Sequence, residues 1–289
     1  MRINYSTTLV MLLFLILSIL TVVNAHWAEW LALILIILAG IPHGSFDLRV
    51  AREKWHSHAL SLRSISLVYL TCVFSMTALC VFAPPVGLSI FLVLSVLHFA
   101  EGEGFLAKQV RSWIGLWIGS AAILLPIGLH ADQSKRYIEF FISPAIFEQI
   151  SAPLTIVSSV VFVALSILLI VETLRNTRGS RITTFERALC LVGWAILPPL
   201  SGFAVWFIGR HSRIHLEHCM KHCEKPGALP IDFVIISAIA IVGLLPFTLL
   251  FNLAEINDLF AASICLIAGL TLPHMIVSHG MYRKSAASQ

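Results

Sequence analysis

Histidines placed where an apolar segment meets polar sequence are the residues of this chain whose type and spacing suit chemistry. The run FIGRHSRIHLEHCMKHC, from Phe207 to Cys223, contains His211, His215, His218 and His222. At about 100° per residue in an α-helix, these four imidazoles fall on one narrow stripe. An imidazole that faces lipid or an apolar core costs free energy unless it is hydrogen-bonded or bound to a metal. The stripe therefore predicts a metal site or a hydrogen-bonded polar site.

Three further histidines stand near the ends of other apolar segments: His43 in GIPHGSFD, His98 in HFAEGE and His274 in PHM. With His211 and His215 they are expected at one depth in a membrane, on four helices that run in the same direction. Helices that each contribute one or two imidazoles can build a metal centre between them. Iron, copper, zinc and nickel all accept such an all-nitrogen set, so ligand softness leaves the metal open.

Carboxylates follow several of these histidines at short offsets. Asp47 comes one turn after His43, and Glu101 and Glu103 come soon after His98. A carboxylate at such an offset can accept the second ring N–H of a ligating imidazole and thereby orient it. The same residues could instead cap the helices at the membrane interface. We expect Asp47 and Glu101 to line the site or to accept a hydrogen bond from a ligating imidazole and so orient it.

Other kinds of site are poorly supported. The six cysteines are scattered and imply no disulfide framework. Cys219 and Cys223, together with His218 and His222, lack the C-x2-C spacing of a zinc knuckle, so we favour packed or solvated thiols. The chain shows no Ser/His/Asp or Cys/His arrangement typical of nucleophilic catalysis. No catalytic side chain is therefore expected beyond a metal centre.

The composition places these residues in a membrane protein. Of 289 residues, 58% are hydrophobic and 12% are charged, whereas about 25% are charged in soluble domains. The net charge of +4 comes from short basic loops without interleaved aromatics, so it indicates membrane topology and not nucleic-acid binding. We expect an all-α, polytopic transmembrane bundle of about eight to ten helices, forming one integral-membrane domain over residues 1–289.

About ten apolar segments are long enough to suggest membrane crossings. Residues 1–25 fit a first transmembrane helix or a signal sequence, and an uncleaved helix is favoured because another apolar segment follows at once. Pro198-Pro199 separates the seventh segment from the eighth, because paired prolines break the helical hydrogen-bond ladder. The segments are Leu9–Val23, Trp27–Pro42, Ser64–Phe82, Val86–Ala100, Trp113–Leu129, Pro153–Glu172, Arg187–Leu197, Gly202–His215, Ile231–Leu250 and Leu259–Val277.

Loop charge predicts the orientation. Clusters of Lys and Arg fall on alternate connections, and the opposite connections carry only Lys135 and Arg136. By the positive-inside rule, both termini are cytoplasmic in a multi-pass protein of the cell (inner) membrane. His43, His98, His211, His215 and His274 then lie near the cytoplasmic side.

Four of these runs resemble the motifs of the Brp/Blh family of bacterial and archaeal β-carotene 15,15′-dioxygenases. They are GIPHGSFD, the HFAEGE run from His98, the HSRIH run from His211 and the PHM run from Pro273. They occur in the family's order and at similar separations, over roughly Gly40 to His279. One departure is Glu103, which stands where the family more often has Asp.

The resemblance implies an integral membrane enzyme that uses non-haem ferrous iron, Fe²⁺, and O2 to split the central double bond of β-carotene into two molecules of retinal. Carried over by motif, the iron ligands are His43, His98, His211 and His215. His274 matches a family position to which we assign no ligand role; it could line the pocket or support a ligand. His218 and His222 are expected to lie past the site. Candidate pocket aromatics are Phe46, Phe99, Trp194, Trp206 and Phe207.

The resemblance also implies partners. β-Carotene and O2 are the expected substrates, the lipid bilayer is the expected surroundings, and a retinal-binding rhodopsin is a candidate functional partner for the product. Nucleic acid is not expected as a partner.

Two other functional classes fit the sequence less well. A polytopic transporter, or a proton or metal pathway with a histidine-lined site, would place its polar residues nearer the bilayer midplane and on both sides of it. Here the polar residues gather at one end. A di-iron desaturase or hydroxylase would need more histidine ligands, including paired ones, and this chain has no His-His pair.

Overall fold

A computed structural model describes residues 5–47, 49–51, 62–104, 112–175, 178–222 and 229–287, and this part of the chain is helical without any strand. The predicted all-α class is therefore confirmed. The elements are α1 (Tyr5–His43), α3 (Leu62–Phe82), α4 (Pro84–Gly102), α5 (Ser112–Gly128), α6 (Ala131–Ile138), α7 (Pro144–Arg175), α8 (Arg178–Ile196), α9 (Pro199–Trp206), the π-helix η2 (Phe207–Ser212), α10 (Arg213–His222), α11 (Leu229–Val242), the 3-10 helix η4 (Leu245–Leu249) and α12 (Ile256–Ala287).

The outer surface of the bundle is apolar. In α7, the exposed residues recur every three or four positions, as expected for the outward face of a helix: Ile156, Val160, Val163, Ile167 and Ile170. Such a face suits lipid tails, which are as apolar as the side chains themselves. Among the described residues, five helices are long and apolar enough to cross a membrane, or six if the bent pair α5–α6 is one span. The chain is therefore a membrane protein.

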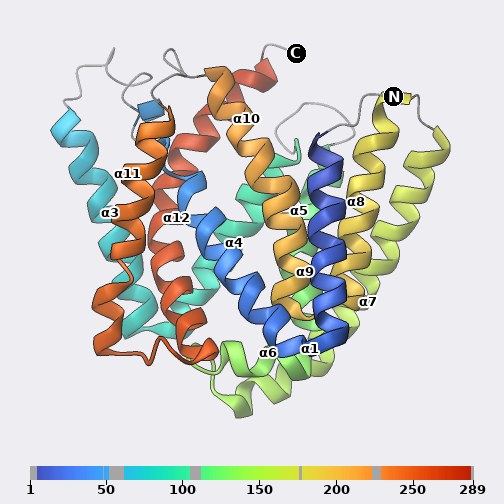
Figure 1. Ribbon diagram of the computed structural model, residues 1–289, viewed down its shortest axis with the longest axis horizontal. Helices are drawn as coiled ribbons and strands as arrows, with labels where there is room; N and C mark the ends of the chain where they lie inside the picture. Colours follow the sequence, from blue (N-terminus) through green and yellow to red (C-terminus); the bar gives the residue numbers. More distant parts are fainter. Residues whose placement is uncertain are drawn as a thin grey trace.

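Breaks in the helices explain why this number is smaller than the ten apolar segments of the sequence. Helix α1 contains both of the first two segments, and the chain bends at Asn24, where φ is −161° and ψ is 103°. Figure 1 shows the two halves of α1 running in different directions from this bend. The Asn24 Oδ1 accepts the backbone N–H of Trp27 at 3.2 Å, which caps the second half as a side chain caps a helix start.

The predicted break at Pro198-Pro199 is confirmed. Helix α8 ends at Ile196 and α9 begins at Pro199, a first-turn position that proline tolerates because its missing N–H would be unpaired there anyway. The region between α5 and α7 differs from the prediction. It was expected to be a loop, but it forms the short helix α6, which bends by 93° from α5.

The helices that carry the predicted ligands run in parallel. In Figure 1 the second half of α1, α4, the stretch from α9 to α10 and α12 all point toward the same end of the bundle. Helix α1 also begins, and α12 ends, at that end. Because the two ends of the chain lie at the same end of the bundle, the fold agrees with an even number of membrane crossings. The cytoplasmic location of that end stays a prediction.

Small residues let neighbouring helices approach closely. A Cβ added to Gly119 on α5 would lie 2.7 Å from both the backbone N of Ala100 and the carbonyl O of Val96 on α4. Backbone atoms cannot move aside as the tip of a side chain can. In a membrane, where apolar burial drives association weakly, this close packing holds helices together and fixes α4 beside α5.

We predict that Gly119→Ala lowers the stability of the folded protein by about 1–3 kcal/mol, because overpacking must push α4 and α5 apart. Gly193→Ala is the matched control, since its added Cβ would lie 3.6 Å from Phe14 Cδ2, an ordinary contact. Thermal unfolding in one detergent measures both variants. Equal melting temperatures for the two variants would contradict the close approach.

Candidate metal centre

Four histidines that are distant in sequence meet inside the bundle. His98 lies on α4, His211 in η2, His215 on α10 and His274 on α12. None of the four is more than 3% exposed. Burying this many imidazoles in an apolar bundle is costly unless they bind a common partner or one another. Three of the four ligands expected from the sequence, His98, His211 and His215, are thus brought together.

The spacing of the rings suits a shared metal ion. The Nε2 atoms of His98 and His274 lie 3.2 Å apart. Two nitrogens bound to one ion at about 2.1 Å, with an angle of about 90–110° between them, would lie roughly 3.0–3.4 Å apart. The ring of His98 is 4.9 Å from that of His211, and the ring of His274 is 4.6 Å from that of His215, centre to centre.

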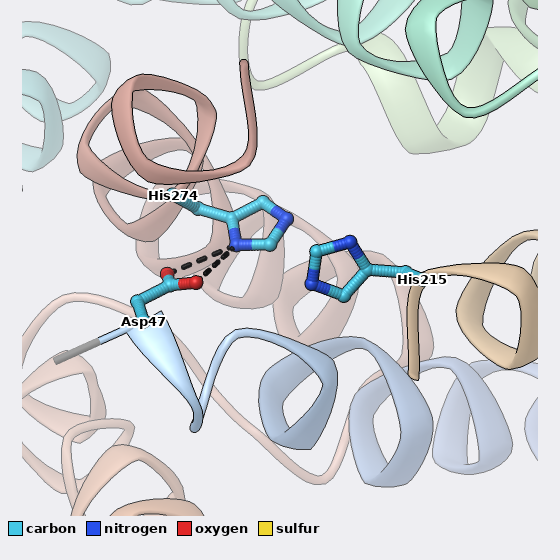
Figure 2. Close-up of side chains that lie close together, drawn as sticks. All are labelled: Asp47, His215 and His274. Carbon is cyan, nitrogen blue, oxygen red and sulfur yellow. Dashed lines mark hydrogen bonds and ion pairs between the residues drawn. The ribbon is translucent and has the colours of Figure 1, made fainter. Parts of the chain in front are cut away.

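Asp47 orients His274 (Figure 2). Both carboxylate oxygens of Asp47 lie 2.9 Å from Nδ1 of His274, and the Tyr69 hydroxyl donates to Asp47 Oδ2 at 3.1 Å. A carboxylate at Nδ1 holds the ring proton there, so the lone pair of Nε2 faces His98. Donor atoms of Asp47, His215 and His274 all lie within 4.8 Å of one another. Together these contacts have the form of a carboxylate–histidine–metal arrangement.

One supporting role agrees with the expectation and another differs from it. His274, expected to line the pocket or support a ligand, lines the apolar cavity, and its Nε2 also lies 3.2 Å from Nε2 of His98. Glu101 was expected near the ring of His98, yet its Oε1 lies 2.6 Å from His279 Nδ1, one turn beyond the cluster. At His98 Nδ1 the structure places the hydroxyl of Ser278 instead, at 3.4 Å. Neither the Glu101–His279 contact nor the His98–Ser278 contact can be predicted from local spacing, because the two partners lie about 180 residues apart in the chain.

The two histidines of the HSRIH run lie in different kinds of helix, the first in a π-helix and the second in an α-helix. His211 lies in η2 and His215 in α10, and the rings of both lie near the ring of His98, at 4.9 and 6.1 Å between ring centres. The i to i+5 bonding of a π-helix widens its turn, and such turns are common at functional sites. His211 stacks on Trp206 and Phe207, with ring centres 5.3 and 5.6 Å apart. Both histidines of the run therefore reach the cluster, one from the π-helix and one from the helix that follows it.

The remaining predicted residues divide into those inside and those outside the described part. The side chains of His43 and His222, and all of Cys223, lie outside the described residues; the backbone of His43 ends α1. His218 has its Nδ1 2.9 Å from the carbonyl O of Ile214 in its own helix. Cys219 is predicted from the sequence to be a packed or solvated thiol. Its Sγ lies 3.2 Å from Nε2 of His215.

A buried ion-pair network lies next to the π-helix. Arg210, 4% exposed, bonds Glu103 through Nη2 at 2.8 Å and Glu186 through Nη1 at 2.9 Å. Arg187 also bonds Glu103, at 2.9 Å. Burial alone would raise the pKa of the Glu103 carboxyl, which follows the span ending at Gly102, but the two guanidinium groups lower that pKa to about 2. The Glu103 carboxyl is thus ionised at neutral pH and holds Arg210, which precedes His211 in the π-helix.

We predict that Arg210→Met destabilises the protein by about 3–5 kcal/mol, because it leaves buried carboxylates without their main partner. The exposed ion pair between Lys135 and Glu148 supplies the control, since pairs in water contribute little. Lys135→Ala should leave the melting temperature nearly unchanged. A small shift for Arg210→Met as well would mean that the network does not hold η2.

An apolar cavity opens onto the histidine cluster. His98 and His274 line it, as do the predicted aromatics Phe99 and Phe207. The other three predicted pocket aromatics lie elsewhere. Trp194 and Trp206 line a separate small void, and Phe46 packs in a small core with Cys219 and Val277. The cluster is therefore reached from an environment of hydrocarbon side chains.

Comparisons with known proteins identify the family. A protein-family model described as "Beta-carotene 15,15'-dioxygenase" matches residues 34–282. The chain is also similar to the protein named "Beta-carotene 15,15'-dioxygenase" from uncultured marine bacterium 66A03, with 24% identity over 272 residues, which is 88% of this chain and 94% of that protein. No solved structure matches.

Proposed function

The chain belongs to the β-carotene 15,15′-dioxygenase family and is an enzyme, and on that premise we propose that it uses ferrous iron and O2 to split β-carotene into two molecules of retinal. The observation that carries the proposal is the buried cluster of His98, His211, His215 and His274 at the end of an apolar cavity. Family membership decides against the transporter hypothesis. It also favours a substrate that is almost insoluble in water.

The donor set fits iron. Neutral imidazoles suit Fe²⁺ among several metals, and iron accepts four or more of them while a position for O2 remains. We assign His98, His211 and His215 as ligands and add His274, because its Nε2 faces His98 and its Nδ1 is held by Asp47. His43 stays a predicted ligand on the strength of its motif.

The reaction balances without a further reductant. The central double bond breaks, each of its two carbons takes one atom of O2, and two aldehydes form. When bound, iron would supply the activation of O2. The protein's own groups hold the ligand nitrogens, keep the proton of His274 at Nδ1, and surround the substrate with apolar side chains that exclude water. No acid–base pair is required.

The surroundings of the enzyme follow from the same proposal. Apolar helices surround the cavity, so β-carotene can enter from the lipid bilayer of the cell (inner) membrane. Both ends of the chain would face the cytoplasm, as loop charge predicts. The product, retinal, has the chemistry of a rhodopsin chromophore, and a retinal-binding rhodopsin is the functional partner that we propose.

Expression in a bacterium that accumulates β-carotene tests the activity. The unaltered chain should bleach the orange pigment and yield retinal. His98→Ala, His211→Ala and His215→Ala should each reduce retinal at least about 100-fold, because losing a metal ligand should cost no less than the roughly 10–100-fold lost with a residue that only supports a ligand. His26→Ala, at an exposed histidine that bonds Trp30, is the control. Unchanged pigment with normal membrane expression of the unaltered chain would overturn the proposal.

Iron retention tests the role of Asp47 separately from turnover. Asp47→Asn weakens the acceptor at His274 Nδ1 and should lower iron affinity by roughly 10–100-fold. Purified protein is dialysed against graded chelator, and bound iron is measured by mass spectrometry. Asp258→Asn, which alters an exposed carboxylate that accepts the Asn252 N–H, should match the unaltered protein. Equal iron retention by both variants would remove Asp47 from the site.

A further inference from the structure

The cavity beside the histidines is long and closed at its far end by α6. His98 and His274 line one end, and Tyr137, Ile138 and Phe141 line the other. Figure 1 places α6 at the end of the bundle opposite α10. The cavity volume is about 160 Å³, counted as the space open to the centre of a water molecule.

The length of the cavity corresponds to half of a C40 carotene. Along α4 the lining runs from Leu88 to Phe99, which spans about 16 Å at 1.5 Å per residue. Along α12 it runs from Phe260 to His274, about 21 Å by the same rise. An extended chain covers about 1.2 Å per bond, so the nine bonds from the central double bond to the ring, and the ring itself, need roughly 15 Å. A whole carotene is about twice as long.

Three of the hydroxyl groups that line the cavity are already bonded within the protein, and two of them, on Ser134 and Tyr137, lie at its closed end. The Ser134 hydroxyl donates to the carbonyl O of Pro126 at 3.3 Å, and the Thr271 hydroxyl donates to the carbonyl O of Ile267 at 2.7 Å. The Tyr137 hydroxyl donates to Glu29. Hydroxyls already bonded within the protein do not call for a polar ligand. The closed end therefore fits an unsubstituted hydrocarbon ring.

The closed end is anchored to the rest of the bundle. Helix α6 lies at 93° to α5. Glu29, 1% exposed on α1, accepts hydrogen bonds from both Arg136 and Tyr137. A buried carboxylate with a cationic partner resists displacement, because separating the two would leave a buried charge unpaired. This contact gives the cavity a floor at a set distance from the histidines.

From these observations we propose that α6 is a ruler for the cleavage position: it seats one ring of the carotene, so that the central double bond comes to the histidine cluster. The inference rests on the proposed function. A ring that stops higher or lower by about 2.4 Å, the length of two bonds, would bring the next double bond of the chain to the cluster. The two products would then be unequal in length.

Product lengths test the ruler. Phe141→Ala should deepen the floor and Ser134→Leu should raise it. Both variants should increase the ratio of unequal apocarotenals to retinal several-fold over the unaltered enzyme, as measured by chromatography of extracted pigments. Phe147→Ala is the matched control, because Phe147 is 3% exposed, like Phe141 at 2%, but does not line the cavity. It should change yield alone and leave the product ratio unaltered.

The outcomes separate the two proposals. If the unaltered chain yields no retinal, the proposed function fails. If it yields retinal while both floor variants give retinal alone, as Phe147→Ala does, the ruler is wrong and the function stands. If Phe141→Ala does not accumulate in the membrane, Phe141→Leu takes its place, and Ser134→Leu is read in either case.

Discussion

The hydrogen bond between His274 and Asp47 is the contact on which the site depends. It joins α12 to the segment that follows α1, and the Tyr69 hydroxyl adds α3 to the same carboxylate. A carboxylate that is 1% exposed would cost several kcal/mol in an apolar bundle without such partners. The three segments must therefore meet at this point, and their meeting turns His274 toward His98.

A second polar contact holds the other side of the cluster. Arg210 and His211 are neighbours in the π-helix, and the buried bonds of Arg210 to Glu103 and Glu186 tie this helix to α8 and to the end of α4. A π-helix is rare because its bonding geometry is less favourable than that of an α-helix. Tertiary contacts of this strength can stabilise it. The result is that the rings of His211 and His215 both lie near His98.

The histidines and the apolar cavity occupy successive levels of the bundle, and a second buried carboxylate, Glu29 with its partner Arg136, lies at the α6 end. The histidines and the ion-pair network gather at one end, and the cavity extends from them between hydrocarbon side chains toward α6. This separation suits a substrate that has no polar group and a metal centre that needs nitrogen donors. It also makes the distance between the two ends of the cavity a structural quantity that the protein can set.

Much of this was predictable because it depends on local properties. Apolar segments, the break at Pro198-Pro199 and the histidine-containing runs all follow from residue type and spacing. The contacts of Glu101 with His279 and of Ser278 with His98 were missed, because partners about 180 residues apart leave no local signal. Helix α6 was missed as well, since its short, polar sequence resembles a loop.

The sequence by itself determined the helical class, the membrane setting and which histidines have polar neighbours, because composition and periodicity act within a few turns of chain. Only the tertiary structure decided how they meet. It placed His274 among the expected ligands, formed a π-helix at His211 and closed the cavity with α6. Those outcomes depend on how whole helices pack, on close approaches such as that at Gly119, and on buried charges that must find partners across the bundle.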